Sequence, residues 1–223
     1  MSGTVTDLAE RVRAGLAARA DPAAAPAMQA YMKSAMPFRG VPKPARTALL
    51  AELVHRRDDP TMVEAAAVAL WDGAAYREER YVAVALARRL RPDPDRLPLI
   101  EHWIRTGAWW DLVDEIAVHL VGPLLQADPG RAEPVMRAWM VDDDRWLRRA
   151  AVIAQLGARS ATDVGLLADA VDANQDDPDF FLRKAIGWAL RQHARTDPEW
   201  VRAFVAAHPR LSPLSRKEAL RHL

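Results

Sequence analysis

Cysteine is absent from this chain of 223 residues, glycine is scarce, and no long apolar run occurs. Without cysteine the chain has neither a disulfide framework nor a thiolate metal site, and we expect a cytoplasmic protein. Only ten glycines occur, and none belongs to a glycine-rich turn between strand and helix, which argues against dinucleotide-binding and P-loop folds. We expect neither a membrane span nor a signal peptide, because both need a continuous apolar segment that the sequence lacks.

Charge of one sign is not in excess over the whole chain, but it is unevenly distributed. Lys plus Arg number 31 and Asp plus Glu number 30, so the net charge is +1. Residues 181–223 hold nine basic and three acidic side chains, a local net charge of +6. Such a segment is either an ordinary solvated helical surface or a positive face for an anionic partner such as nucleic acid.

Apolar residues recur at spacings of three and four along the chain, which is the period of an amphipathic helix. Leu8, Val12 and Leu16 form one such face, and prolines lie between the faces. Aspartate precedes proline at four boundaries, as an N-cap residue precedes the first helical residue: Asp59, Asp128, Asp177 and Asp197. Ser215 with Glu218 has the spacing of a capping box.

Similar segments return at a regular interval. An aromatic residue is followed by aliphatic and basic residues and then by small apolar ones; Trp110 and Trp146 are 36 residues apart, and Trp146 and Phe181 are 35 apart. A helix pair repeated at this interval is typical of a HEAT-like solenoid, although an irregular helical bundle is the alternative. We therefore predict a single all-α domain over residues 1–223, a HEAT-like helical-repeat solenoid of about twelve helices with a concave ligand-binding face.

Trp110 and Asp114 are the first candidate site residues. They are four residues apart and share a helix face, whereas Leu112 and Ile116 lie on the stripe expected to face the core. Trp110 also fits an ordinary core aromatic. Asp111 and Asp114 both fit the helix N-terminus, where negative charge is favourable, and Asp111 fits it better because it lies in the first turn.

A second group of candidates combines an aromatic residue with cations on one helix. The stripe has spacings of four, three and four residues: Lys184, Trp188, Arg191 and Arg195. Arg145 and Arg149 offer a similar exposed cationic face on the preceding repeat. A cationic and aromatic surface suits a nucleic-acid backbone, and a solvated polar face is the alternative.

Other catalytic arrangements are missing from the sequence. None of the six histidines forms an HxxxH or HExxH pair, and no GxSxG segment supports a catalytic serine. We expect no metal site and no cofactor. A carboxylate among aromatic residues is the best remaining chemical candidate.

Five segments together resemble the DNA alkylation repair glycosylases of the AlkD type. They follow in the family's order at compatible spacing: Tyr31–Lys33 with Pro37–Val41 and Pro44–Arg46, Trp109–Asp114 (WWDLVD), Trp146–Ala151 (WLRRAA), Phe180–Trp188 (FFLRKAIGW) and Pro213–Ala219. The combination of WWDxVD with KAIGW is specific to this family. The resemblance runs from about residue 26 to the C-terminus, so residues 1–25 lie outside it.

The resemblance implies a monomeric, cofactor-free helical-repeat enzyme of base excision repair that holds duplex DNA. It implies hydrolysis of the N-glycosidic bond of purines made cationic by alkylation, chiefly N7-alkylguanine and N3-alkyladenine. By motif position, Asp114 is the catalytic carboxylate, and Trp110 and Trp188 flank the lesion nucleotide. Arg149 is a backbone or lesion contact, and Tyr31 is a further wall. The family leaves the damaged base stacked, unlike glycosylases that flip it.

Two other classes of protein share such a fold. A non-catalytic DNA-binding relative is expected to have lost the carboxylate, which this chain keeps as Asp114. A HEAT-like protein-interaction scaffold is expected to lack a basic concave face and salt-sensitive DNA binding.

Overall fold

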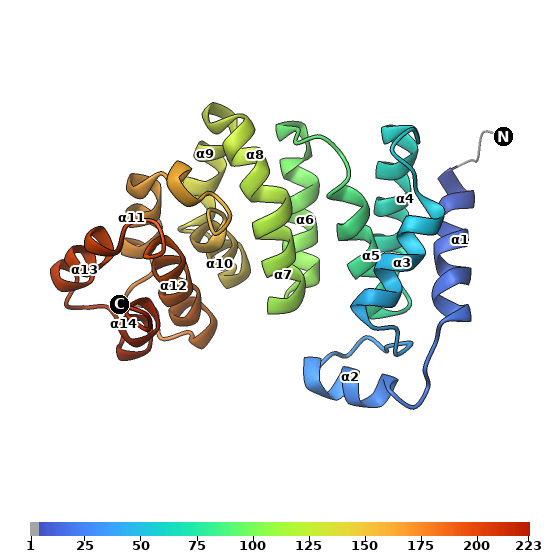
Figure 1. Ribbon diagram of the computed structural model, residues 1–223, viewed down its shortest axis with the longest axis horizontal. Coiled ribbons are helices and arrows are strands. Elements are labelled where there is room, and N and C mark those ends of the chain that lie inside the picture. Colours follow the sequence, from blue (N-terminus) through green and yellow to red (C-terminus); the bar gives the residue numbers. More distant parts are fainter. Residues whose placement is uncertain (1–4) are drawn as a thin grey trace. The chain divides into compact units, whose positions relative to one another are not determined.

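The computed structural model describes residues 5–223, and over that range it contains helices and no strand (Figure 1). The α7 helix (Trp110–Ile116), the π-helical segment η2 (Ala117–Val121) and α8 (Gly122–Ala127) follow one another without a break, so the described range holds thirteen separate α-helices. The predicted all-α class is confirmed. The helices form two compact units, Met1–Arg91 and Pro92–Leu223.

The first unit contains five helices: α1 (Val5–Ala18), α2 (Ala25–Met32), α3 (Lys43–Leu53), α4 (Pro60–Asp72) and α5 (Arg77–Ala87). The α1 face expected from the sequence is its core face, since Leu8, Val12 and Leu16 are at most 2% exposed. In contrast, α2 has no buried residue. The segment that follows α2, in contrast, is anchored in this unit.

That segment is held by a buried carboxylate. Glu78, which is fully buried, accepts backbone N–H hydrogen bonds from Arg39, Gly40 and Val41 at 2.9–3.1 Å. Gly40 has φ +82°, and a Cβ atom there would lie 2.1 Å from the Asp21 carbonyl oxygen. The Pro-Phe-Arg-Gly-Val segment therefore serves the fold, because its backbone N–H groups satisfy the buried oxygens of Glu78 and only glycine fits its turn.

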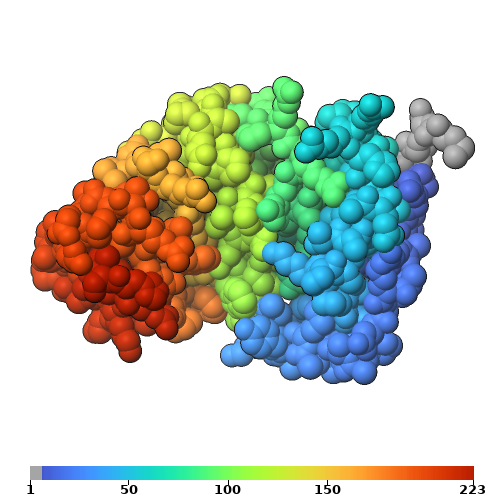
Figure 2. Space-filling view, in the orientation of Figure 1, coloured from blue at the N-terminus to red at the C-terminus, as the bar shows by residue number. Residues whose placement is uncertain are grey.

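The second unit repeats a helix pair. Its remaining elements are η1 (Pro94–Arg96), α6 (Leu97–Gly107), α9 (Pro129–Trp139), α10 (Arg145–Ile153), η3 (Arg159–Ala161), α11 (Val164–Asp172), α12 (Phe180–His193), α13 (Pro198–Ala207) and α14 (Pro213–Ala219). Four pairs follow one another: α6 with α7, α9 with α10, α11 with α12, and α13 with α14. The second helices of consecutive pairs are in contact. In Figure 2 the atoms of this unit, coloured from green to red, form one continuous packed surface.

The interval of the repeat agrees with the sequence. The second helices α7, α10 and α12 begin at Trp110, Arg145 and Phe180, 35 residues apart at each step. The structural equivalents thus differ by one residue from the aromatic alignment, because Arg145 and Phe180, not Trp146 and Phe181, correspond to Trp110. The predicted helical repeat is confirmed for this unit.

Helix caps largely follow the predicted pattern. Three of the four expected aspartates cap their helices by accepting a backbone N–H hydrogen bond: Asp59, Asp128 and Asp197. The fourth prediction is wrong, since Asp179 caps α12 and Asp177 instead accepts from the backbone N–H of Asp179. The capping-box prediction is also wrong, because Ser212 caps α14 by accepting from the backbone N–H of Ser215, and the Glu218 carboxylate binds cations on α12.

The core stripe of α7 is as predicted. Leu112 and Ile116 are fully buried, and Leu120, in η2, is 8% exposed. The wider π turn comes directly before Gly122 and Pro123; proline has no N–H and cannot continue the hydrogen-bond ladder of an α-helix. No helix among residues 5–223 is long and apolar enough to cross a membrane.

We expect Ile116→Ala to lower the free energy of unfolding by about 2–5 kcal/mol, because it leaves a cavity in a core that cannot fully collapse. Chemical denaturation measures the change. Val141→Ala is the matched control, since Val141 is 73% exposed and its truncation should change stability by less than about 0.5 kcal/mol. Equal losses in the two variants would contradict the core assignment of Ile116.

Candidate functional site

A hollow in the second unit gathers most of the residues that the sequence singles out. Its volume is about 270 Å³. Its walls come from the second helix of each pair, α7, α10, α12 and α14: Trp110, Arg149, Phe180, Phe181, Lys184, Trp188, Arg191 and Glu218. Aromatic rings and cations thus line the same space, whereas Asp114, Arg145 and Arg195 of the same predicted stripes are not among the wall residues.

Beside this hollow, the guanidinium group of Arg149 binds both oxygens of the Asp114 carboxylate. Its Nε donates to Oδ1 and its Nη2 donates to Oδ2, each at 2.7 Å. Its Nη1 donates to the carbonyl oxygen of Phe181 at 2.6 Å. Three consecutive second helices, α7, α10 and α12, therefore meet at one guanidinium group. A paired, fully hydrogen-bonded geometry is what a buried ion pair needs to offset the cost of leaving water.

The prediction that Arg149 is exposed is wrong. Arg149 is 5% exposed. Its place on a polar helix stripe follows from the sequence, but α7 and α12 cover that stripe, and Asp114 and Phe181 occupy its donors. The residue lines the hollow, yet it serves first as the partner of the carboxylate.

Asp114 is itself largely buried, with 15% of its side chain exposed. Burial raises the pKa of this carboxyl above the usual aspartate value. The hydrogen bonds and positive charge of Arg149 act in the opposite direction, while Asp111 and Glu115 add a smaller upward effect. Arg149 is thus the group that favours the ionised form of a carboxylate whose surroundings disfavour charge.

The aromatic residues divide into two sets. Trp110 and Trp188 are half-buried and face the hollow from α7 and α12, as predicted. Trp109, Trp146 and Phe181 form a packed cluster with ring centroids 5.0–5.9 Å apart. This cluster joins the N-terminal ends of α7, α10 and α12, so it fixes the helices that carry the hollow.

Sequence reasoning misses Phe180, Phe181 and Glu218 as wall residues. Phe180 is 56% exposed and contacts Phe181 edge to face, with centroids 5.5 Å apart. A large apolar side chain left in solvent at the rim of a hollow is a signal of binding that only the structure gives. The spacing of Glu218 from Ser215 assigns it to a helix cap instead.

The cationic stripe of α12 is only partly free. The Lys184 Nζ lies 2.9 Å from one oxygen of Glu218, and Arg191 binds the other oxygen. Arg195 is exposed. On α10, Arg145 is exposed, stacks on Trp146 and pairs with Asp179 at 2.9 Å; it is not one of the wall residues.

Tyr31 belongs to the first unit. It lies on α2 and is 73% exposed. An exposed tyrosine on a helix without buried residues is available to a partner, and its predicted role at DNA stays a prediction.

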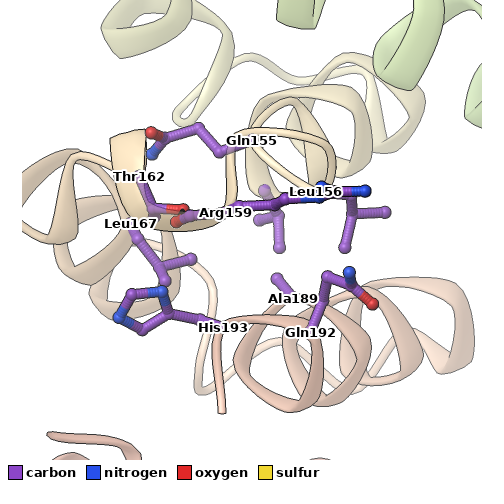
Figure 3. A pocket seen from close by; sticks show the side chains of 9 residues that line it. Gln155, Leu156, Arg159, Thr162, Leu167, Ala189, Gln192 and His193 are labelled. Atoms are coloured by element: carbon purple, nitrogen blue, oxygen red, sulfur yellow. Dashed lines mark hydrogen bonds between the residues drawn. The ribbon is translucent and has the colours of Figure 1, made fainter. Parts of the chain in front are cut away.

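A second, smaller hollow lies between α10 and α12 (Figure 3). The His193 ring reaches into it towards Leu167, and among the described residues neither ring nitrogen has a hydrogen-bond partner. Burial lowers the pKa of His193, so the ring is neutral at pH 7. With about 10 Å³ of space, it holds at most one water molecule. Residues 5–223 contain no cluster of three side chains suited to a metal ion.

The chain is similar to known proteins over most of its length. A model of the DNA alkylation repair enzyme family matches residues 12–223, beginning closer to the N-terminus than the motifs do. Among solved structures, the chain is similar to a "Predicted DNA alkylation repair enzyme" from Enterococcus faecalis, with 29% identity over 92% of this chain and 97% of that one and a TM-score of 0.80. No curated protein sequence matches. The chain belongs to the DNA alkylation repair enzyme family.

Proposed function

We propose that the protein is a DNA glycosylase that hydrolyses the N-glycosidic bond of cationic alkylated purines, N7-alkylguanine and N3-alkyladenine, in duplex DNA. The observation that carries the proposal is the buried Asp114 carboxylate, held by Arg149 beside an aromatic and cationic hollow. A non-catalytic DNA-binding relative is expected to have lost this carboxylate, and the chain keeps it. A protein scaffold has no use for the cations around it.

Release of a cationic base requires a negative charge beside the sugar and does not require a general acid. An alkylated N7 or N3 purine already carries a positive charge, so it leaves as a neutral base and no group must protonate it. The barrier comes from the positive charge that develops on the deoxyribose, as in other glycosidic cleavages. A carboxylate beside the sugar stabilises that charge and orients the attacking water.

Asp114 is suited to this task by its partner. A carboxylate has about four lone-pair positions, and Arg149 uses one on each oxygen. The remaining positions are free to face a sugar or a water molecule. Because Arg149 also binds Phe181, the carboxylate cannot rotate, and its orientation is set before substrate arrives.

The aromatic walls suit a cationic nucleotide. The ring faces of Trp110 and Trp188 attract positive charge through their quadrupoles, both on the alkylated base and on the sugar to which the charge moves as the bond breaks. Lys184, Arg191 and Arg145 supply contacts to phosphates, which position the duplex without reading its sequence. Tyr31, on the first unit, stays a predicted contact to DNA. No metal or cofactor enters this scheme, and the monomeric state and cytoplasmic location stay predictions.

We expect Asp114→Asn to slow base release from duplex DNA carrying one N7-methylguanine by about a hundredfold or more, a loss of the size found when one electrostatic stabiliser is removed. The amide keeps the size of the side chain and removes its charge. Abasic sites, converted to strand breaks by alkali, measure release under single-turnover conditions. Binding to the same duplex should persist, because a negative charge near phosphates is removed.

Asp111→Asn is the matched control for this variant. Asp111 lies in the first turn of α7 and is 8% exposed. Its Oδ1 accepts from the backbone N–H of Leu112 at 2.9 Å. Its amide should therefore lower stability slightly and leave base release near the wild-type rate. Full activity of Asp114→Asn would end the assignment of this carboxylate.

Arg149→Met should lower the free energy of unfolding by about 3–5 kcal/mol, because it leaves the Asp114 carboxylate buried and unpaired. It should also abolish most base release. The double variant Arg149→Met/Asp114→Leu should regain stability and remain inactive, since a buried ion pair is replaceable by apolar groups. Arg145→Met is the exposed control and should change stability little. Denaturation curves and single-turnover rates decide; a stable Arg149→Met single variant would contradict the pairing.

The enzyme should discriminate by the charge of the base. Uracil and 8-oxoguanine are uncharged and need a proton donor in order to leave. A side chain whose two oxygens both accept from Arg149 is poorly placed to act as that donor. We expect release of N7-methylguanine and no measurable release of either uncharged base from otherwise identical duplexes. Efficient uracil removal would show that a general acid acts in this hollow.

A further inference from the structure

The C-terminal helix α14 packs against α12 so closely that a side chain at position 187 would clash with it. A Cβ atom at Gly187 would lie 2.5 Å from the Glu218 Cβ and 2.9 Å from the Ser215 carbonyl oxygen. The Ser215 hydroxyl donates to the Arg183 carbonyl oxygen of α12 at 2.9 Å. Gly187 is thus required by close helix packing, and the result is a fixed height of Glu218 against α12.

From that position Glu218 bridges two cations of α12, while the Nη1 of Arg221, three residues after it, lies 3.9 Å from Oε2. Oε1 accepts from the Lys184 Nζ at 2.9 Å, and Oε2 accepts from the Arg191 guanidinium. The Glu218 side chain is 12% exposed, whereas those of Lys184 and Arg191 are 39% and 23% exposed. All three side chains line the hollow. The two cations are more exposed than the carboxylate, and each has N–H donors that Glu218 does not use.

We propose that Glu218 is a positioning residue: it holds Lys184 and Arg191 together as one preformed seat for a DNA phosphate beside Trp188. The proposal rests on the proposed function for its ligand, a phosphodiester of duplex DNA. It adds a role for α14 and for Gly187, which lets α14 approach.

The electrostatics favour positioning over simple neutralisation. Two cations on one helix face repel each other and, without a partner, extend separately into solvent. One carboxylate between them leaves a net positive charge and removes the rotational freedom of both side chains, so less entropy is lost when a phosphate binds. The hydrogen bond from Lys184, and then that from Arg191, lower the pKa of Glu218, so it is ionised at neutral pH.

Glu218→Gln separates the two roles because they predict opposite signs. If Glu218 only neutralises charge, its removal strengthens binding to duplex DNA and steepens the salt dependence. If it positions the cations, its removal weakens binding and makes the salt dependence shallower by about one unit for each phosphate that the cations no longer bind.

The experiment measures dissociation constants of the full chain for a duplex with a central tetrahydrofuran abasic analogue and for an undamaged duplex, over a salt series. We expect Glu218→Gln to weaken binding to the analogue about tenfold, the value of one charge-assisted hydrogen bond, with a shallower salt slope. Glu218→Asp, which keeps the charge, should recover part of the loss. Glu133→Gln on α9, which removes a carboxylate paired with Arg137, is the matched control and should bind like wild type.

A double-mutant cycle keeps the result independent of folding defects. In the Lys184→Gln/Arg191→Gln background, Glu218→Gln should cause no further loss if it acts through these cations. Tighter or unchanged binding of Glu218→Gln, or an equal loss in both backgrounds, overturns the proposal. These binding measurements do not need base release, so an inactive wild-type protein would refute the glycosylase assignment and leave this result interpretable.

Discussion

The guanidinium of Arg149 is the group on which the candidate site depends. It is buried, and a buried cation is tolerated only when its donors find acceptors of matching geometry. Two donors go to Asp114 and one goes to the Phe181 carbonyl oxygen, so its position is dictated by α7 and α12 at once. The same contacts orient the carboxylate and bring the start of α12, with Phe180, to the rim of the hollow. Stability and chemistry in this region therefore share one interaction.

Contacts across one repeat recur elsewhere in the second unit. Arg105 on α6 pairs with Asp142 at 2.8 Å, and Arg137 on α9 pairs with Asp169 at 2.7 Å. Exposed pairs of this kind contribute about 0–1 kcal/mol each. They act on the alignment of neighbouring helix pairs more than on total stability. The pair at Arg149 is by contrast largely removed from water, and its effect on the fold is correspondingly larger.

The sequence predicts the structural features that depend on a single helix. Periodicity identifies Ile116 as core and Trp110 as outside it, and the interval of aromatic segments gives the repeat. Pairing between repeats is not predictable in this way, because it depends on how neighbouring helices are shifted along each other by a few ångströms. For that reason the sequence pattern places Arg149 in solvent and Glu218 in a cap. The wrong cap prediction at Asp177 has a different cause, which is local. A second aspartate, Asp179, lies two residues later and caps α12.

The site also has an evolutionary consequence. Asp114, Arg149 and Lys184 are the fifth residues of α7, α10 and α12, so one position of a repeated unit supplies a carboxylate, the arginine that binds it and a cation of the hollow. A helical-repeat array tolerates the gain or loss of a whole repeat, because each repeat contacts only its neighbours. The hollow does not tolerate it. Deleting α9 and α10 would preserve the packing pattern but place Lys184 where Arg149 belongs, and a lysine cannot hold a carboxylate bidentately. The hollow therefore requires these three repeats in this number and order, although each repeat has the same fold.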